Sequence, residues 1–433
     1  MYSLDGLGYL LQKMKGKRIM NIVYVAYCCA PYNGSEASIG WEIPLNASRN
    51  NKVFLVTVPE SKPFIDRYYA ETMGGQASSN LIIKYVDIPK KYKDIFRGPL
   101  YTFRLNIWHQ EAARLIGEIC RENSIDVIHQ ITPVEFRSIG PYDRIKGVKF
   151  ICGPVGGGEY APAPLNDYLQ GHFKTEYIRK VANQISGALL NKRKLNILFA
   201  NEETKKLVRP NSDAKCVTEI GISPNMFLDN TVKKDSYTNK TINFLVAGRL
   251  LYRKGHLLLI DALKLLPKNA DYICKIIGDG PCYSEIEERI KELGNNVILK
   301  NAVSYTEMKR EYAEADVLIM PSLRETTGTV LLEALANGVP VITVDKFGGH
   351  TLLDESVSWF YDGNTKDEYI RNLSTVIYNC IENRSEVLRK AENTVKYAKR
   401  YTWDKKVEQY IEIYRELIGD QNDSNKGRFK GIS

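Results

Sequence analysis

Short apolar runs rich in β-branched and aromatic residues alternate with helical patterns along most of this chain. In the first half, such runs predict strands at 18–27, 52–58, 81–88, 126–131, 148–153, 196–201 and 215–221. Helical patterns separate most of these strands, for example at 104–122 and 172–192. Because this alternation is typical of a sheet buried on both faces, the first half predicts a parallel, doubly wound α/β domain.

The same alternation restarts after a polar stretch at 229–241, "DNTVKKDSYTNKT", which is typical of an interdomain linker. Strands are then predicted at 242–248, 272–278, 296–301, 316–322 and 339–344, with helices at 255–266, 282–293, 304–314 and 328–337. From about residue 364 the pattern is helical. A length of 433 residues also exceeds what one ordinary core accommodates, so two domains are expected.

The predicted fold class is therefore α/β, with two Rossmann-like doubly wound domains facing across a cleft. We place the N-terminal domain at 20–230, the C-terminal domain at 231–400, a closing helix at 401–418 and a disordered tail at 419–433. Residues 1–19 are interpreted as an extension or a start-site artefact. They lack the long apolar core of a secretory signal, and the chain has no apolar run long enough to span a bilayer.

Charge and cysteine usage narrow the classes of partner. The chain has 60 basic and 51 acidic residues, which favours anionic partners. The segment 89–104 is basic with interleaved aromatic residues and is either a solvated surface or a contact with an anionic membrane. No recognition motif supports nucleic-acid binding. The eight cysteines and five histidines have no metal-type spacing, so we expect no metal site and a reducing, cytoplasmic location.

Two segments carry candidate chemistry. In "VAGRLLYRKGHLLLIDAL" (246–263), a strand ends at Gly248, and Arg249 and Lys254 follow on a loop that opens a helix. Both cations could reach one diphosphate there, unless they are ordinary loop charges. In "RETTGTVLLEALANG" (324–338), Glu325 sits on the loop after a buried strand and Glu333 lies one to two turns into the following helix. Hydroxyl pairs of a hexose and a ribose would satisfy Glu325 and Glu333 respectively, unless Glu333 is an exposed or ion-paired helix residue.

These motifs together resemble the retaining glycosyltransferases of family four, which have the GT-B fold. The residues that carry the resemblance are the E-x7-E pair after a Pro-Ser turn, the G-R…K-G strand-loop-helix, "APYNGSEASIGWE" (30–42), "DVIHQ" (126–130), "GVPVI" (338–342) and the terminal "YTWDKKVEQYIEIY". The resemblance covers nearly the whole chain. It implies an acceptor-side N-terminal domain, a C-terminal domain that binds the nucleotide sugar, and a closing helix that crosses back to the first domain.

The resemblance also implies roles for individual residues. Arg249, Lys254 and Glu325 would be catalytic, with the two cations on the diphosphate and the carboxylate facing the donor sugar. Glu333 would hold the ribose, and the other donor-binding positions would be Gly34, Gly248, Thr326, Thr327, Gly328 and Thr329. The donor would be a UDP- or GDP-linked sugar, with no cofactor and no metal required. The chain departs from the family in having Thr326 and Thr327 where Gly-Phe is frequent, and in having Ile131 where a second histidine follows the first.

His129 is thus a sugar or acceptor contact or a satisfied core histidine. The expected acceptor is a lipid-linked or polysaccharide intermediate of bacterial surface or capsular polysaccharide synthesis, reached at the inner face of the membrane. The alternatives are a soluble transferase with a small-molecule or protein acceptor and a non-catalytic nucleotide-sugar-binding protein. A nucleic-acid-binding module rests on charge alone. The loop "CGPVGGGEYAPAP" (152–164) lacks dinucleotide-binding spacing and is expected to line the cleft as a rigid segment.

Overall fold

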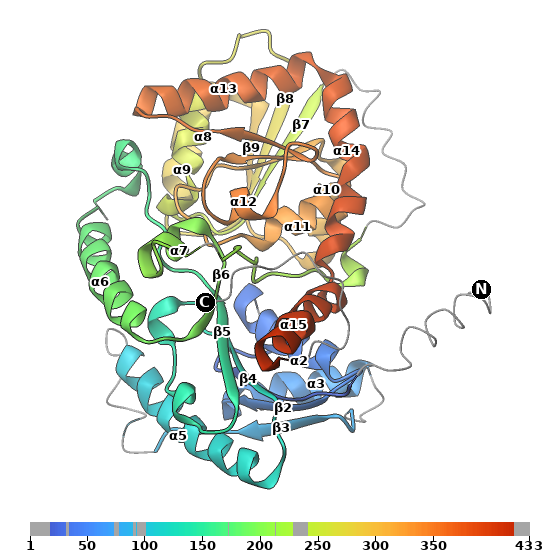
Figure 1. Ribbon diagram of the computed structural model, residues 1–433. Helices are drawn as coiled ribbons and strands as arrows, with labels where there is room; N and C mark the ends of the chain where they lie inside the picture. Colours follow the sequence, from blue (N-terminus) through green and yellow to red (C-terminus); the bar gives the residue numbers. More distant parts are fainter. Residues whose placement is uncertain are drawn as a thin grey trace, which may run out of the picture. The chain divides into compact units, whose positions relative to one another are not determined.

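The computed structural model describes residues 18–31, 34–72, 78–89, 92, 101–171, 173–212, 214–227 and 241–419 (Figure 1). Most of the predicted N-terminal extension, most of the basic segment 89–104, the linker up to residue 240 and the tail from residue 420 lie outside the described residues.

Two six-stranded sheets form the framework. The first has the order β3-β2-β1-β4-β5-β6 and the second the order β12-β11-β10-β7-β8-β9. The recorded strand pairings, such as β1 with β4 and β7 with β10, are parallel. Each sheet therefore repeats the Rossmann order 3-2-1-4-5-6, with a switch point between its first and fourth strands. This confirms the predicted α/β class with two doubly wound domains.

The elements of the first sheet and the helices between its strands follow the predicted alternation. They are β1 (Asn21–Ala26), α2 (Ser35–Ala47), β2 (Lys52–Thr57), α3 (Lys62–Thr72), β3 (Leu81–Tyr85), α5 (Tyr101–Glu122), β4 (Val127–Thr132), β5 (Lys149–Val155), α6 (Phe173–Lys192), β6 (Asn196–Phe199) and α7 (Glu202–Val208).

The second sheet is built in the same way and is followed by three helices. Its elements are β7 (Ile242–Ala247), α8 (His256–Leu263), β8 (Tyr272–Ile277), α9 (Tyr283–Ile290), β9 (Val297–Lys300), α10 (Tyr305–Glu314), β10 (Val317–Met320), α11 (Thr329–Ala336), β11 (Val341–Val344), α12 (Phe347–Leu352) and β12 (Ser358–Tyr361). The closing helices are α13 (Lys366–Glu382), α14 (Arg384–Ala398) and α15 (Trp403–Ile418).

The chain divides into two compact units. Among the described residues, the first unit holds 18–133, 140–151 and 411–419, and the second holds 134–139 and 152–410. The second unit thus contains the whole second sheet together with β6, α6 and α7. The domain boundaries expected from the sequence, at 20–230 and 231–400, stay a prediction, as does the cleft.

One predicted strand is wrong. Residues 215–221 form no strand, although the run is apolar and β-branched. Separate backbone contacts occur instead: Val217 N donates to Phe199 O, and Ile222 N, directly after the run, donates to Tyr401 O. Because the buried side chains are covered by these neighbouring segments, the run satisfies its apolar pattern without joining a ladder.

The core of the second unit explains how its loops are placed. Helix α8 is buried around nearly its whole circumference, since Leu257, Leu258, Leu259 and Ile260 are all enclosed. A helix that is apolar all round needs partners on both sides, and α8 packs against α13 as well as within the core of the second sheet. Its N-terminus, and with it the loop that carries Lys254, is therefore fixed relative to β7 and β10.

Candidate functional site

A pocket opens at the switch point of the second sheet. Its empty volume is about 250 Å³, including space open to solvent. It is lined by Val246, Ala247, Gly248, Arg249, Lys254, His256, Ile319, Met320, Pro321, Ser322 and Val330. These residues come from the carboxyl ends of β7 and β10 and from the starts of α8 and α11. Ligands of open α/β sheets bind at this place in the fold, so the pocket is the candidate site.

The loop after β7 brings Gly248 and Arg249 to the pocket, as predicted. Gly248 adopts a φ of 139°, and a Cβ built on it would meet nothing within 4 Å. The Arg249 side chain is exposed and makes no hydrogen bond or ion pair with any described residue. An open backbone position beside an unpaired guanidinium suits the approach of a phosphate group.

Lys254 is held at the pocket by tight backbone packing and by an ion pair. Gly255, directly after it, has a φ of 72°, and a Cβ there would lie 1.9 Å from Pro321 O. Glycine is thus required where the two loops meet. The Lys254 ammonium is ion-paired with Glu325, whose carboxylate also lies 3.5 Å from Arg253. The structure therefore joins two of the predicted catalytic residues directly.

The loop after Glu325 presents unused backbone donors. The amides of Thr326, Thr327 and Gly328 donate no hydrogen bond to any described residue. Gly328, at a φ of 97°, is the N-cap of α11, and Thr329 is the first residue of that helix. Successive free N–H groups at a helix N-terminus form a site for oxygen atoms that carry negative or partial negative charge. The predicted donor-binding loop has the geometry for this role.

Two buried polar contacts fix this loop from behind. Asn201 Nδ2 donates to Thr326 O at 3.3 Å. Thr327 Oγ1 donates to Glu219 Oε2 at 2.7 Å. Since both partners are buried, they limit how far the loop can move. Neither partner was identified from the sequence.

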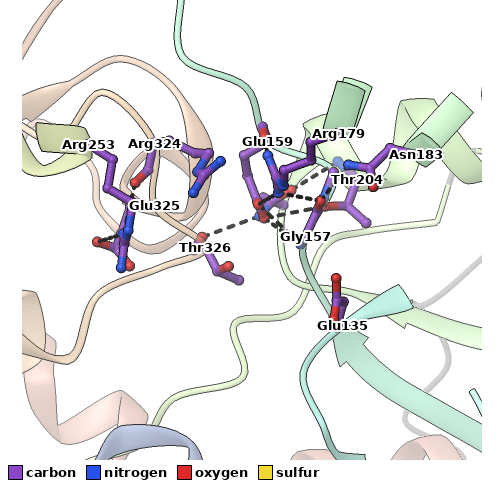
Figure 2. Close-up of polar contacts among 12 residues, drawn as sticks. Glu135, Gly157, Glu159, Arg179, Asn183, Thr204, Arg253, Arg324, Glu325 and Thr326 are labelled. Carbon is purple, nitrogen blue, oxygen red and sulfur yellow. Dashed lines mark hydrogen bonds and ion pairs between the residues drawn. The ribbon is translucent and has the colours of Figure 1, made fainter. Parts of the chain in front are cut away.

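Asn201 is in turn part of a network around the buried Glu159. Figure 2 shows Glu159 together with Gly157, Arg179 and Thr326. Glu159 Oε1 accepts from Asn201 Nδ2 at 2.5 Å and from the Gly157 amide at 3.0 Å. On the other side, Arg179 donates to the carbonyls of Gly157 and Glu159. The glycine-rich loop expected to line a cleft therefore acts as a support for Thr326. Nothing in its spacing indicated that contact.

Two further polar atoms at the pocket lack partners. Ser322 Oγ and His256 Nδ1 are buried, line the pocket and have no hydrogen-bond partner among the described residues. Burial, and then the charge of Lys254, lowers the pKa of His256 to about 4, so the ring is neutral at pH 7. Buried polar atoms are normally satisfied, which indicates that a ligand or water completes this pocket. The Pro-Ser turn was a sequence signal for Ser322, whereas His256 had none.

Glu333 is on α11 but is not among the pocket-lining residues. Its Oε2 accepts a hydrogen bond from Tyr312 at 2.9 Å, and burial raises its pKa. One carboxylate oxygen is therefore occupied by the protein. Its predicted role on a ribose stays a prediction.

The remaining two predicted residues belong to the first unit. Gly34 is the N-cap of α2, has a φ of 77° and would meet nothing within 4 Å if it carried a Cβ. His129 on β4 is fully buried, and its Nδ1 lies 2.5 Å from Tyr414 Oη. This contact favours the core-histidine alternative, and the sugar-contact role stays a prediction. Among the described residues, no three His, Cys, Asp or Glu side chains gather as a metal site.

We expect Glu219 to make stability depend on pH. Burial raises its pKa to about 7, and the nearby Lys406, also buried, has its pKa lowered by burial to about 8. In the unfolded chain Glu219 loses its proton near its ordinary value, so between that value and pH 7 the folded state binds more protons. The free energy of unfolding should therefore fall by about 3 kcal/mol as pH rises through this window.

The measurement is urea unfolding of the wild type and Glu219→Gln at about pH 5 and about pH 7.5. Glutamine keeps an acceptor for Thr327 but does not titrate, so the wild-type loss should be absent from the variant. Parallel changes in both proteins would rule out Glu219 as the source. Exposed Glu382→Gln is the control and should behave as wild type.

Comparison with known proteins gives one family and several relatives. Residues 229–400 match the family model described as "Glycosyl transferases group 1". The chain is 33% identical over 194 residues to an uncharacterized glycosyltransferase of Methanocaldococcus jannaschii, covering 43% of this chain and 52% of that protein. It is 31% identical over 189 residues to a D-inositol 3-phosphate glycosyltransferase of Corynebacterium urealyticum, covering 41% and 43%. The matches thus span about half the length of these relatives.

A solved structure of HepE from Anabaena, in complex with UDP, has the same fold. It superimposes with a TM-score of 0.60 at 14% identity, covering 92% of this chain and 100% of that one. At this identity the likeness shows the fold, which extends over both sheets.

Proposed function

We propose that the chain, whose residues 229–400 match the group 1 glycosyltransferase family model, is a retaining glycosyltransferase that uses a nucleotide-diphosphate sugar. The observation that carries this proposal is the pocket at the switch point of the second sheet. Arg249 and Lys254 line this pocket, and Lys254 is ion-paired with Glu325, which directly precedes the unused amides.

The pocket supports a specific division of labour. The diphosphate would bind at Gly248, Arg249, Lys254 and the start of α8, where positive charge stabilises the leaving group as the glycosidic bond breaks. The sugar would bind along Glu325 and the amides of Thr326, Thr327 and Gly328, with Thr329 at the start of α11. The binding of UDP by the similarly folded HepE supports a UDP-linked donor, with GDP as the other candidate. We propose that no metal is required, because these cations and amides neutralise the diphosphate.

For the acceptor we propose a lipid-linked or polysaccharide intermediate in bacterial surface or capsular polysaccharide synthesis. The enzyme would then be cytoplasmic and in peripheral contact with the inner face of the membrane. The alternative is a small phosphorylated acceptor, which the name of the Corynebacterium relative exemplifies. Transfer of radiolabelled sugar into an organic-extractable product would favour the lipid-linked acceptor, whereas a label that stays in the aqueous phase would favour the alternative.

The first experiment is calorimetric titration of UDP, GDP and ADP, with and without Mg²⁺, into wild type and Glu333→Ala. We expect one nucleotide to bind without metal, and the variant to bind it about 10- to 100-fold more weakly, because a charged hydrogen-bond acceptor for the ribose is lost. Glu382→Ala, an exposed substitution on α13, should bind like wild type.

Each outcome is informative. No binding of any nucleotide by the wild type would contradict the donor site. Binding that requires Mg²⁺ would contradict the metal-independent mechanism. Equal affinity of wild type and Glu333→Ala would remove Glu333 from the site, and its bond to Tyr312 would then be its main role.

A further inference from the structure

Helix α6 presents its apolar side to solvent. Tyr177, Ile178, Val181, Ile185 and Leu189 are 70%, 67%, 40%, 59% and 59% exposed. Their spacing along a 20-residue helix places them on one continuous stripe. Helices on the surface of a globular domain normally bury such a stripe, and a clustered exposed apolar surface of this kind marks an interaction site.

The opposite side of α6 is polar apart from Gly187 and Leu190, and it is firmly attached to the rest of the second unit. Arg179 donates to Gly157 O at 2.7 Å, and Asn183 Nδ2 donates to the same carbonyl at 2.9 Å. Glu176 is ion-paired with Arg324. At Gly187 a Cβ would lie 2.9 Å from Leu207 O, so α6 and α7 pack closely there (Figure 1). These contacts fix the rotation of the helix and leave the apolar stripe outside.

The charged residues on α6 indicate which kind of partner suits the apolar stripe. Lys174, Lys180 and Lys192 are exposed on the same helix. The single acidic residue of α6, Glu176, is turned inward to Arg324. An apolar stripe accompanied by lysines, without an exposed carboxylate, is the composition of a helix that lies in the interface of an anionic bilayer.

Self-association fits this surface less well. If two copies paired through α6, an antiparallel arrangement would bring Lys174 of one copy near Lys192 of the other. A parallel arrangement would bring identical lysines together. Either arrangement places like charges at the contact, which is unfavourable.

We propose that α6 is a membrane-docking helix that lies flat on an anionic lipid surface. Ile178, Ile185 and Leu189 would enter the boundary of the acyl chains, and the lysines would reach the headgroups. Across the described ranges no helix combines the length and apolar character needed to span a bilayer. Helix α6 is also distinct in sequence from the segment 89–104, for which the sequence analysis left open a solvated surface or a contact with an anionic membrane.

The test is sedimentation of the full chain with vesicles of phosphatidylcholine, with and without phosphatidylglycerol. We expect binding to the anionic vesicles that falls by more than about tenfold in the triple variant Ile178→Ser, Ile185→Ser, Leu189→Ser, since three apolar side chains lose their insertion. The matched control is Leu265→Ser, which alters an apolar side chain 54% exposed elsewhere on the second unit and should bind like wild type. The triple variant Lys174→Gln, Lys180→Gln, Lys192→Gln should lose the preference for anionic vesicles.

A local probe assigns the contact to α6. The fluorescence of Ile185→Trp, less that of the wild type, should shift to the blue when anionic vesicles are added. Absence of wild-type binding, or equal binding by the serine triple variant, would overturn the proposal. So would a concentration-dependent dimer that the serine triple variant abolishes, since the occupant would then be a second copy. Vesicle binding needs no nucleotide and nucleotide titration needs no vesicle, so this proposal and the proposed enzyme function fail separately.

Discussion

Lys254→Ala is expected to lower kcat/KM for UDP release from a UDP-linked donor sugar by about 100- to 1,000-fold, the usual cost of losing one group that stabilises charge at the transition state. Lys254 lines the pocket and is positioned by Gly255, so no other described lysine can replace it there. Because the leaving diphosphate gains charge as the sugar departs, most of the loss should be in kcat. Affinity for UDP itself should fall less.

The matched control is Lys268→Ala, an exposed lysine of the same unit that is not among the pocket-lining residues. It should keep wild-type activity. A Lys254→Ala enzyme with normal kcat and raised KM would contradict the transition-state role and leave Lys254 as a binding residue. Donors with other nucleotides should be assayed if the titration selects another base.

Because Lys254 and Glu325 form an ion pair, we also expect substitutions at these two residues to have coupled effects on catalysis. Before the donor binds, the Glu325 carboxylate neutralises the ammonium and also lies 3.5 Å from Arg253. Glu325→Gln should therefore impair catalysis, and the double variant with Lys254→Ala should lose much less than the product of the single losses. Independent, multiplicative losses would mean that Glu325 acts on the sugar alone, without positioning Lys254.

The fold could be predicted from the sequence because its signal is local. Each buried strand of a parallel sheet is a short apolar run, and each crossover helix has its own period, so the alternation is visible without tertiary contacts. There were two exceptions: 215–221, where an apolar run is buried by single backbone contacts to distant segments, and β12, a strand that was not predicted. The pattern also predicted α6 correctly. It could not show that this helix turns its polar side inward, because periodicity reports that two faces differ and not which one is covered.

The loops that carry the predicted site residues could be identified from the sequence for the same reason. Arg249, Lys254 and the residues from Glu325 to Thr329 directly follow strands, and the carboxyl ends of neighbouring strands lie together in such a sheet. The buried contacts that support the loop at Thr326 and Thr327 could not be predicted from the sequence. Asn201 is 125 residues from Thr326, and Glu219 is 108 residues from Thr327. A single sequence contains no signal for pairs so far apart.

The second large effect is expected when a residue of this supporting network is replaced. Glu159→Ala should lower the free energy of unfolding by about 3 kcal/mol, because it leaves buried donors without their acceptor. Those donors are Asn201 Nδ2 and the Gly157 amide, and the Arg179 guanidinium 3.9 Å away loses a neighbouring charge (Figure 2). Urea unfolding measures the loss. Glu287→Ala, an exposed glutamate on α9, should be neutral.

The same variant separates a structural role from a role at the site. Asn201 Nδ2 donates both to Glu159 and to Thr326 O. Removing the Glu159 carboxylate therefore leaves the Asn201 side-chain amide, which restrains the loop at Thr326, without one of its two partners. UDP affinity of Glu159→Ala, measured where the variant is fully folded, should therefore be weaker than wild type, and Glu159→Gln should restore most of it because its amide oxygen can still accept from Asn201. Unchanged UDP affinity in a destabilised Glu159→Ala would mean that the loop keeps its position without this network, with the contact to Glu219 sufficient to hold it.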